Sequence, residues 1–402
     1  MYISDLALSD FRNYREAVAR FTEGVITIVG ANGQGKTNLV EAIAYLSTFS
    51  SHRVSADAAL VRAGAAGAVV RAKVMSNGHP TVLELEIIAG RANRARINRA
   101  PARTRDLLGV IRTVVFAPED LALVKGDPAE RRRYLDDLVV ARTPRLTVVR
   151  GEYEKILRQR SALLKSTGGG RRVPGALMST LDVWDGHLAA AGAQMMAARS
   201  ALVSELAPLV ATAYRSVSDG ADEATIEIRS SLEKAEQRAA EGDSEAGQPP
   251  TPDPLDIDAL TARLVDAMHL LRPQELDRGV CLVGPHRDDL VLRIGDLPAR
   301  GYASHGESWS LALALRIGAF ELLREDGPAG ETPILILDDV FAELDMKRRA
   351  RLASMVGEAQ QVFITAAVPE DIPAELTGRR FGVTDGVVEL EEEAPPGAGD
   401  NP

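Results

Sequence analysis

The sequence predicts an α/β fold in which two strands that end in polar loops are separated by a long insertion of antiparallel strands and paired helices. Three observations predict it. A β-branched strand runs into a glycine-rich loop and a helix near the start; a second buried strand ends in two aspartates about 300 residues later; alternating strands and then helices of three-and-four spacing lie between them. At 402 residues the chain exceeds what one hydrophobic core usually serves, so we expect a main domain with a sizeable subdomain.

The opening MYISDLALSDFRNYREAVARF reads as a strand, a turn at Arg12 to Tyr14 and a returning strand. The short buried strand VITIVG follows, and it leads through GANGQGKT into the helix NLVEAIAYLSTF. Residues 67 to 98 carry the alternating runs AVVRAKVM and TVLELEII on either side of Asn77-Gly78, which is a hairpin signal. This region therefore predicts an antiparallel sheet rather than another crossover unit.

The loop Gly30-Ala31-Asn32-Gly33-Gln34-Gly35-Lys36-Thr37 matches the pattern G-x-x-x-x-G-K-[ST] at each fixed position. Glycines let successive amides turn inward around a β-phosphate. Lys36 supplies a point charge to the β and γ oxygens, and the Thr37 hydroxyl is a magnesium ligand. A strand precedes the loop and a helix follows it, so a chance glycine turn is the weaker interpretation and the sequence predicts nucleotide binding.

The middle of the chain predicts a helical hairpin. Apolar residues recur from Leu146 to Leu163 with Arg160 interrupting them, and after GGGRR the pattern resumes from Leu177 to Leu202, with Pro208 expected to kink or end the second helix. We assign residues 1–140 and 275–402 to the main domain and 141–274 to the inserted arm. Because residues 231–256 are rich in acid, glycine and proline, we expect a mobile loop there, and a disordered tail EEEAPPGAGDNP.

The second half of a nucleotide site is predicted at Ile334-Leu335-Ile336-Leu337-Asp338-Asp339. A strand that is apolar on both faces suits a parallel sheet, and Asp338 emerges at its carboxyl end, where magnesium is held. Asp339 beside it could orient or deprotonate an attacking water. The alternative, a buried strand followed by a turn with two aspartates, is weakened by the glycine loop earlier in the chain.

The stretch ASHGESWSLALALRIGAFELL places a small polar loop before an apolar helix. Alone, it is best read as a helix cap at Ser304, a turn at Gly306 and a buried helix. In order, however, the glycine loop, the long insertion, this loop, the Asp-Asp strand and Ala342-Glu343-Leu344-Asp345 resemble the layout of ATP-binding-cassette (ABC) ATPases. The resemblance implies an ABC-type P-loop ATPase head with an antiparallel β subdomain and an inserted helical hairpin, a short coiled coil.

Several stretches resemble one family closely, the RecF recombination-mediator ATPases, which are relatives of Rad50 and of the structural-maintenance-of-chromosomes proteins. The stretches are LSDFRNY, GANGQGKTNLVEAI, SHR at Ser51 to Arg53, VVFAPEDLALVKGDPAERRRYLD, LVGPHRDDL, ASHGESWSLALALR and ILILDDVFAELD, and they run from residue 6 to residue 345. The resemblance implies an ATP-dependent homodimer, DNA binding in replication and repair, and recombinase loading at gaps with mediator proteins. It also implies a slow, DNA-dependent ATPase.

The resemblance also implies roles for particular residues. ATP would be bound by Gly30 to Thr37 with Asn38, and Arg12 of FRNY would reach the nucleotide. Lys36 and Asp339 would be catalytic, and Thr37 and Asp338 would hold Mg²⁺. Ser304, Gly306 and Glu307 would cap the γ-phosphate bound by a partner's P-loop, and Asp345 would lie in the dimer interface.

Two departures from the wider ABC pattern concern the rate of hydrolysis. The usual catalytic glutamate is Asp339, which is one methylene shorter, and no histidine follows the strand Gln361 to Thr365, where many relatives place a γ-phosphate sensor. No glutamine-loop residue is assigned, and Glu119 or Asp120 is the candidate for that region. We therefore expect a clamp switched by ATP rather than a fast motor.

The net charge of −10 hides an uneven distribution of charge along the chain. Residues 91–172 contain 20 Lys and Arg against 9 Asp and Glu, whereas residues 219–258 contain 12 acidic residues and 3 basic ones. Arginines attract backbone phosphates whatever the base sequence, although any one of them alone is more often a solvated surface charge. The candidate DNA-binding residues are Arg91, Arg94, Arg96, Arg99, Arg103, Arg105, Arg131 and Arg132.

Aromatic residues make up only 4% of the chain, so stacking of single-stranded bases on aromatic side chains is poorly supported. We therefore expect contact mainly with duplex backbone, and binding at junctions of single- and double-stranded DNA is a second possibility. Two other classes are weighed. A transporter or translation-type ATPase has no reason to carry FRNY and the arginine-rich insertion, and an ABC-type adaptor with a structural nucleotide would show no turnover. No membrane-spanning run occurs and Cys281 is the single cysteine, so we expect a cytoplasmic protein without membrane contact.

Overall fold

The computed structural model describes residues 1–51, 53–54, 56–166, 175–218, 222–242, 255–328, 330–376 and 378–391. They form two compact units. The first contains Met1–Val124, Leu209–Ala221 and Ser304–Pro402, and the second contains Lys125–Pro208 and Asp222–Ala303. This division assigns residues 125–140 and 275–303 to the second unit, whereas the sequence analysis placed them in the main domain. Among the described residues, no helix has the length and apolar character needed to cross a membrane.

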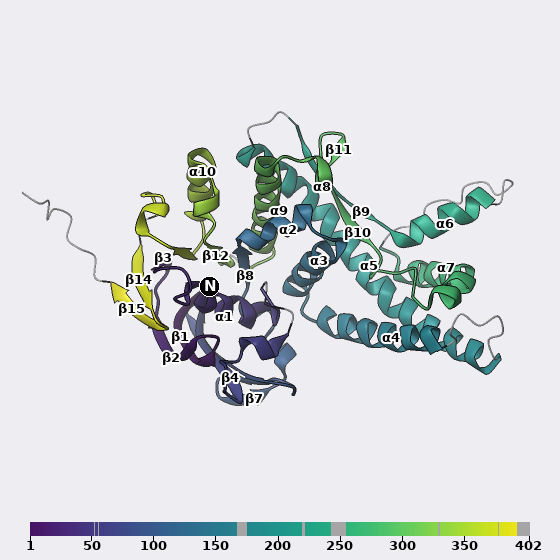
Figure 1. Cartoon of the computed structure of the whole chain (residues 1–402), viewed down its shortest axis with the longest axis horizontal. Coiled ribbons are helices and arrows are strands. Elements are labelled where there is room, and N and C mark those ends of the chain that lie inside the picture. The colour runs from purple at the N-terminus through teal and green to yellow at the C-terminus, as the bar shows by residue number, and fades with distance from the viewer. Residues whose placement is uncertain are drawn as a thin grey trace, which may run out of the picture. The chain divides into compact units, whose positions relative to one another are not determined.

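The first unit contains two sheets with a helix between them (Figure 1). Its elements are β1 (Tyr2–Phe11), β2 (Tyr14–Arg20), β3 (Gly24–Val29), α1 (Lys36–Thr48), β4 (Gly67–Ser76), β5 (His79–Ile88), β6 (Arg94–Ile97), β7 (Ala100–Ala102), β8 (Thr113–Phe116), α2 (Leu121–Lys125), which ends at the boundary, α9 (His305–Glu325), β12 (Ile334–Asp338), α10 (Met346–Val356), β13 (Gln361–Ala366), β14 (Arg379–Thr384) and β15 (Val387–Glu391).

The sheet that carries the polar loops has the strand order β15-β14-β3-β13-β12-β8, and all its pairs are parallel except β14 with β15. The second sheet is antiparallel, in the order β2-β1-β4-β5-β6-β7. Helix α1 is buried on nearly every side because its apolar residues meet both sheets in one core. The two hairpins predicted at Arg12 to Tyr14 and at Asn77-Gly78 are both confirmed. Since the carboxyl ends of β3 and β12 lie at one edge, segments 300 residues apart meet there.

The second unit is built from helices and a small sheet, β11-β10-β9. Its elements are α3 (Pro128–Arg142), α4 (Leu146–Ser166), α5 (Gly175–Val217), which crosses into the first unit after Pro208, β9 (Ala224–Arg229), α6 (Ser231–Gly242), α7 (Ile257–Arg278), β10 (Asp289–Ile294), β11 (Leu297–Pro298) and α8 (Ala299–Tyr302). The two predicted long helices are α4 and α5, and helix α5 runs on past Pro208 instead of ending there.

The arm is more than a hairpin, because α6 and α7 pack on the same core as α4 and α5. The expectation of a mobile loop over 231–256 is wrong for residues 231–242, which form α6; its buried Leu232 and Ala235 join that core. Residues 243–254, the GGGRR turn and the acidic tail from 392 lie outside the described residues. At the centre of the arm, Arg160 is fully buried and paired with Asp185 and Glu275, each at 2.6 Å.

Candidate functional site

The glycine-rich loop adopts a backbone that only glycine tolerates at two positions. Gly30 (φ 158°) faces the backbone of β14, and a Cβ there would lie 2.3 Å from the carbonyl oxygen of Val383. Gly35, at φ 120°, ends the loop at the N-terminus of α1, where a Cβ would lie 2.7 Å from the side chain of Asn13. The loop therefore approaches its neighbours as closely as bare backbone allows.

Segments from both ends of the chain hold this loop (Figure 1). From the β1–β2 turn, the Tyr14 hydroxyl donates to the carbonyl oxygen of Gly35 and the Asn13 amide donates to that of Gln34, both at 2.9 Å. From the β14–β15 turn, the backbone amide of Asp385 donates to the Gln34 side chain at 2.6 Å. The FRNY stretch is thus a brace for the loop, which explains why Asn and Tyr follow the arginine.

The predicted phosphate and magnesium ligands lie together at the edge shared by β3 and β12. Lys36 is nearly buried, and its ammonium donates to the carbonyl oxygen of Gly30 at 2.8 Å. The Thr37 hydroxyl donates to the Asp338 carboxylate at 3.0 Å. The two halves of the predicted site, 301 positions apart, are therefore in direct contact, as the sequence pattern required.

The carboxylate of Asp338 is buried and hydrogen-bonded from two sides. Besides Thr37, the Thr365 hydroxyl at the end of β13 donates to it at 2.6 Å. Burial raises the pKa of Asp338 to about 6; the hydrogen bonds from Thr365 and Thr37 act against this rise, and the negative charges of Asp339 and Glu119 add to it. A cation at this point would relieve the cost of the buried charge, and hydroxyl and carboxylate oxygens are ligands that Mg²⁺ prefers.

Asp339 is held beside this carboxylate in a strained backbone conformation. Its φ of 51° is left-handed, which is uncommon for a residue other than glycine. Its backbone amide donates to the Thr365 hydroxyl at 2.9 Å, so one threonine fixes both aspartates. The Asp339 side chain is half-buried, and its carboxylate has no hydrogen-bond or ion-pair partner in the part of the chain that the structure describes.

Arg12 lies beside α1 with its guanidinium engaged. It makes a two-point ion pair with Glu41, at 2.7 and 2.8 Å, and donates to the carbonyl oxygen of Ala59 at 3.0 Å. Glu41 is completely buried, accepts from Ser51 and lies 3.6 Å from Arg53. The SHR stretch and the FRNY arginine therefore converge on one carboxylate of the P-loop helix. The expected contact of Arg12 with a nucleotide stays a prediction.

The loop before α9 is exposed at its tip. Ser304 and His305 face solvent, while the helix behind them is buried. Ser304 accepts from the Glu307 amide at 3.2 Å and the Glu307 carboxylate accepts from the Ser304 amide at 2.8 Å, which is a capping box. These bonds lower the pKa of Glu307. The carboxylate of Glu307 and the hydroxyl of Ser304 are thus both used within the helix cap, and Ser304 is the more exposed of the two.

Asp345, predicted in a dimer interface, follows β12 and is close to the same loop. It is half-exposed and paired with Arg348 of α10. Arg348 also donates to the Ser310 hydroxyl of α9 at 3.1 Å, and a Cβ on Gly306 would lie 3.2 Å from its guanidinium. The Asp345 segment and the Gly306 loop are therefore joined through one arginine.

The candidate DNA-binding arginines divide into two groups. Six are exposed around the edge hairpin β6–β7 of the antiparallel sheet, as predicted: Arg91, Arg94, Arg96, Arg99, Arg103 and Arg105. Arg131 is different, because it is 4% exposed and its guanidinium makes a two-point pair with Asp289, at 2.8 and 3.0 Å. Its role is structural, and we remove it from the DNA-binding set. Arg132 is half-buried and donates to the carbonyl oxygen of Asp288 at 2.9 Å.

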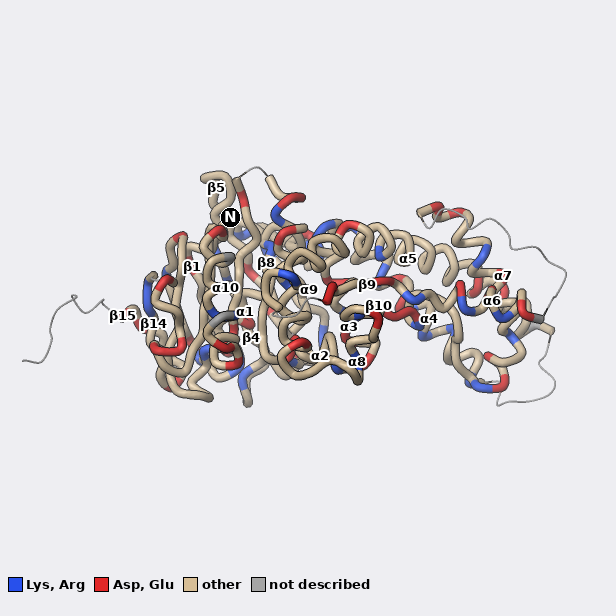
Figure 2. Tube along the Cα trace, turned by 90° about the horizontal axis from the view of Figure 1, so that it is seen from above, with Lys and Arg blue, Asp and Glu red and all other residues tan. Residues whose placement is uncertain are grey.

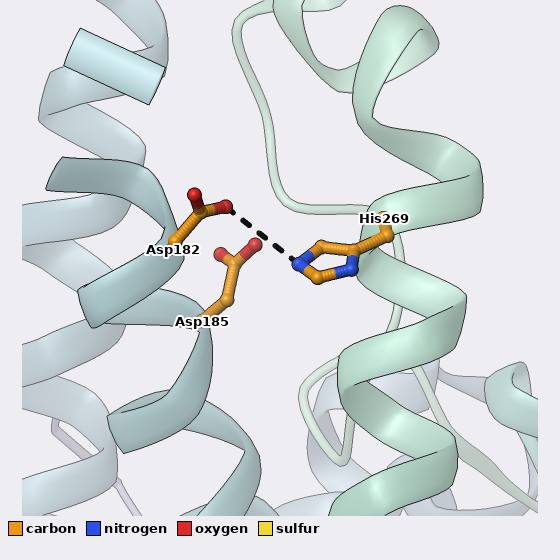
Figure 3. A group of neighbouring side chains, drawn as sticks. All are labelled: Asp182, Asp185 and His269. Atoms are coloured by element: carbon orange, nitrogen blue, oxygen red, sulfur yellow. Dashed lines mark ion pairs between the residues drawn. The ribbon is translucent and has the colours of Figure 1, made fainter. Parts of the chain in front are cut away.

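One group in the second unit has the composition of a metal site but not its electrostatics. Asp182 and Asp185 of α5 face His269 of α7 (Figure 3), and the imidazole lies 3.7 Å from Asp182. Both carboxylates are already paired with arginine: Arg272 contacts both of them, and Arg160 contacts Asp185. Since two guanidinium charges repel a further cation, we assign this group to the packing of the arm.

Two residues of the nucleotide site were not singled out from the sequence. Thr365 is a hydroxyl residue near the end of the otherwise apolar stretch VFITA, and Glu41 is a lone acid in the apolar helix NLVEAIAYL. A polar side chain at a buried position of a regular element needs a partner, and this was the available signal. The partners themselves come from distant segments, so the signal gives the residue but not its contact.

Comparisons with known proteins agree with this geometry. The family described as the RecF/RecN/SMC N terminal domain matches residues 2–379. The chain is similar to the DNA replication and repair protein RecF of Beutenbergia cavernae, at 59% identity over 96% of this chain and 99% of that protein, and to RecF of Frankia alni, at 54% identity with the same coverage. A solved structure of the recombination mediator protein RecF with ATP superimposes with a TM-score of 0.83, at 27% identity over 97% of this chain and 98% of the other. An Smc head bound to the C-winged helix domain of ScpA shares the fold, with a TM-score of 0.53 and 17% identity over 98% of both chains.

Proposed function

The chain belongs to the RecF family of DNA replication and repair proteins, whose fold is the ABC-type ATPase head, and we propose that it is an ATP-switched clamp on DNA. The contact between Thr37 and Asp338 carries the nucleotide part of this proposal, because it joins a phosphate loop to a buried carboxylate. The RecF structures solved with ATP and with an ATP analogue support the choice of nucleotide.

The residues at the edge of the parallel sheet have three different roles toward ATP: binding the phosphates, holding Mg²⁺ and activating the attacking water. The loop amides from Gly30 to Thr37 and the Lys36 ammonium hold the phosphates, and α1 directs its N-terminus toward them. Thr37 and Asp338 would hold Mg²⁺, which supplies charge neutralisation between the β and γ oxygens. Asp339 accepts a proton from, or orients, the attacking water. Its shorter side chain and the absence of a histidine after β13 in the sequence support slow turnover.

A homodimer completes the site. Ser304 is exposed at the N-terminus of α9, and its position suits the γ-phosphate held by the P-loop of a second copy. The half-exposed Asp345 lies next to the same loop and enters the same interface. ATP therefore joins two copies head to tail, and hydrolysis separates them.

DNA lies against the basic edge of the antiparallel sheet. Arg91 and Arg99 are exposed and make no ion pair within the described ranges, so they contact backbone phosphates without first breaking one. Arg94 pairs only loosely with Glu86, at 3.7 Å, and exchanges it for phosphate, whereas Arg96 is held by Glu84 at 2.8 Å and has to give up that contact first. The similar RecF structures are described in the RecFOR pathway, and on that basis we extend the proposal to mediator proteins that load recombinase at gaps.

The experiment that tests the shared site is complementation between two inactive variants. Lys36→Ala destroys the P-loop and leaves the cap, whereas Ser304→Arg blocks the cap and leaves the P-loop. Each variant alone is expected to hydrolyse no ATP above background. An equal mixture should recover about a quarter of the wild-type rate, since half of the dimers are mixed and each mixed dimer has one intact site.

Four outcomes would contradict parts of the proposal. No recovery in the mixture removes the shared site, provided each variant keeps its wild-type fold by circular dichroism. A wild-type protein that stays monomeric in sedimentation with saturating ATP removes the ATP-dependent dimer. ATP binding without phosphate release, with or without DNA, would favour the adaptor whose nucleotide is structural. A gel shift in which Lys36→Ala keeps ATP-stimulated DNA binding would separate the two halves of the mechanism.

A further inference from the structure

A basic cavity in the second unit is not used by the nucleotide site. Its volume is about 410 Å³, and its lining comes from β9, α6, α7 and the loop that follows α7. The lining residues are Arg229, Ser230, Ser231, Lys234, Ala235, Arg238, Leu271, Gln274, Arg278, Leu282 and Arg287. All of them belong to the second unit, so the cavity is defined within one compact body.

Helical periodicity brings these residues to one wall. Ser231, Lys234 and Arg238 recur every three or four residues and lie on one face of α6. Leu271, Gln274 and Arg278 do the same on α7, which packs against α6 in the core of the arm. The cavity is therefore part of the helix packing and does not depend on loops alone.

The charge of the cavity is entirely positive. Five of the eleven lining residues are cationic and none is a carboxylate. The contrast with the surrounding sequence is sharp, because residues 219–258 contain 12 acidic residues and only 3 basic ones, Arg229, Lys234 and Arg238. All three line the cavity. Figure 2 marks Lys and Arg in blue and Asp and Glu in red along α6.

The carboxylates of α6 are held elsewhere or lie outside the lining. Glu236 makes a two-point pair with Arg263, both contacts at 2.7 Å, and neither residue lines the cavity. Burial raises the pKa of Glu233, which is not among the residues that line the cavity. Of the five cations, Arg229 is the one with an ion pair, to Asp289 at 3.1 Å. The lining of the cavity therefore contains basic residues and no acidic residue.

The remaining cations are exposed and available to a ligand. Among the residues that the structure describes, the ammonium of Lys234 and the guanidinium groups of Arg238 and Arg278 have no hydrogen-bond or ion-pair partner. Arg287 donates from Nε to the carbonyl oxygen of Cys281 at 2.8 Å, which fixes the stem and leaves its terminal nitrogens for another acceptor. Four exposed cations therefore line one cavity without a carboxylate in its lining, which makes the cavity attractive to an anion.

Apolar side chains lie beside the charge. Ala235 and Leu271 are buried, Leu282 is half-buried, and Gln274 adds an amide that donates and accepts. A volume near 400 Å³ lies within the range of small-molecule sites. The chemistry fits a group with a phosphate on one side and a flat or apolar portion on the other, which describes a nucleotide.

We propose that this cavity binds a nucleotide unit of a nucleic acid strand, with its phosphate on Lys234, Arg238, Arg278 and Arg287 and its sugar and base over Ala235 and Leu271. The proposal rests on the DNA-binding function proposed above and adds a contact that is independent of ATP. Arginine supplies three of the four phosphate contacts, and its planar fork matches phosphate oxygens. An acidic peptide would use the same charge but would gain nothing from the apolar floor.

The test measures binding of a fluorescent single-stranded oligonucleotide to the full-length protein without ATP, by anisotropy over a series of salt concentrations. Arg238→Ala combined with Arg278→Ala should weaken binding roughly tenfold and lower the salt slope by about 1.4, because two phosphate contacts are lost and each contributes about 0.7 on a single strand. The matched control is Lys155→Ala combined with Arg158→Ala, which removes two exposed cations from α4 of the same unit and should change neither quantity. Competition with deoxyadenosine monophosphate, inorganic phosphate and polyglutamate identifies the chemistry.

Support requires loss in the cavity variant, no loss in the control, and displacement by the mononucleotide at lower concentration than by phosphate. Equal affinity of the two double variants overturns the inference, as does absence of oligonucleotide binding by the wild type. Equal competition by polyglutamate at the same charge concentration assigns the cavity to an acidic protein segment, and equal competition by phosphate removes the role of the floor. ATP-dependent dimerisation, measured in parallel, is expected to be unchanged in the cavity variant, so failure of the clamp and failure of this site are told apart.

Discussion

Replacing Thr365 by valine removes one hydroxyl and keeps the shape of a β-branched side chain at the end of β13. In the folded protein that hydroxyl donates to Asp338 at 2.6 Å and accepts from the amide of Asp339 at 2.9 Å. No other side chain described at this edge contacts both aspartates. The substitution therefore tests whether the two carboxylates act only when this threonine orders them.

The expected size of the effect follows from the two lost bonds. A hydrogen bond to a charged carboxylate contributes about 1.5–3 kcal/mol, which corresponds to a factor of roughly 10 to 100. Because Thr365 opposes the rise that burial causes in the pKa of Asp338, its loss raises that pKa further and weakens the ligand offered to Mg²⁺. The amide of Asp339 also loses its acceptor, and its left-handed backbone loses a restraint. We expect ATP turnover to fall about 10- to 100-fold, with a higher Mg²⁺ requirement.

The assay is phosphate release under saturating ATP over a titration of Mg²⁺. Thr365→Ser keeps the hydroxyl and should stay within about threefold of the wild type, a loss below 1 kcal/mol. The matched control is Thr27→Val, which makes the same change at a buried threonine of β3 that contacts only the carbonyl oxygen of Arg379, at 3.4 Å. The reasoning is refuted if Thr365→Val retains wild-type turnover at every Mg²⁺ concentration, or if Thr27→Val loses as much.

Three further outcomes are expected. Burial lowers the pKa of His286 from 6.5 to about 4, so as the pH falls the unfolded chain takes up this proton before the folded protein does, and the folded protein loses stability between pH 6.5 and 4. In urea denaturation, the wild type should therefore lose about 2–3 kcal/mol more unfolding free energy than His286→Gln when the pH is lowered from 7 to 4.5. Gly35→Ala places a Cβ 2.7 Å from the side chain of Asn13 at a φ of 120°. This substitution should weaken binding of a fluorescent ATP analogue at least about tenfold without unfolding the protein, and an unchanged affinity would contradict the close approach. Arg160→Met leaves the buried Asp185 and Glu275 without this cation and should cost about 3–5 kcal/mol of unfolding free energy, against no loss for Arg158→Met on the exposed face of α4.

The elements that the sequence predicted well are those whose signal is local. The glycine loop, the strand before it and the hairpin at Asn77-Gly78 each depend on backbone preferences within a few residues. The meeting of Thr37 with Asp338 was also predictable, although it spans 301 positions, because parallel strands bring their carboxyl ends to one edge. The general rule that parallel strands end at the same edge of a sheet was enough to predict this contact without knowledge of the three-dimensional distance.

The errors came from residues whose burial depends on contacts that are distant in sequence. Residues 231–242 have the composition of a mobile segment, yet they form α6 because the side chains of Leu232 and Ala235 are buried in the core that they share with α4, α5 and α7. Arg131 looked like a surface cation, but Asp289, 158 positions later, takes its charge into the interior. Composition reports the average environment of a segment, whereas burial is decided by the few side chains that face the core.

The contacts of Arg348 join the loop that opens α9 to the segment that follows β12. Its guanidinium pairs with Asp345, donates to Ser310 inside α9 and lies against Gly306 at the start of that helix. Asp345 follows the strand that presents Asp338 and Asp339, so a shift of the cap toward a neighbour's phosphate also moves the segment that leads back to the carboxylates. A side chain at Gly306 would come within 3.2 Å of this guanidinium, so the arginine would have to shift by a few tenths of an ångström to accommodate it. Within one chain, Arg348 therefore links the loop before α9 to the segment that follows β12, and in the proposed dimer this arginine would be the route from the cap to the carboxylates.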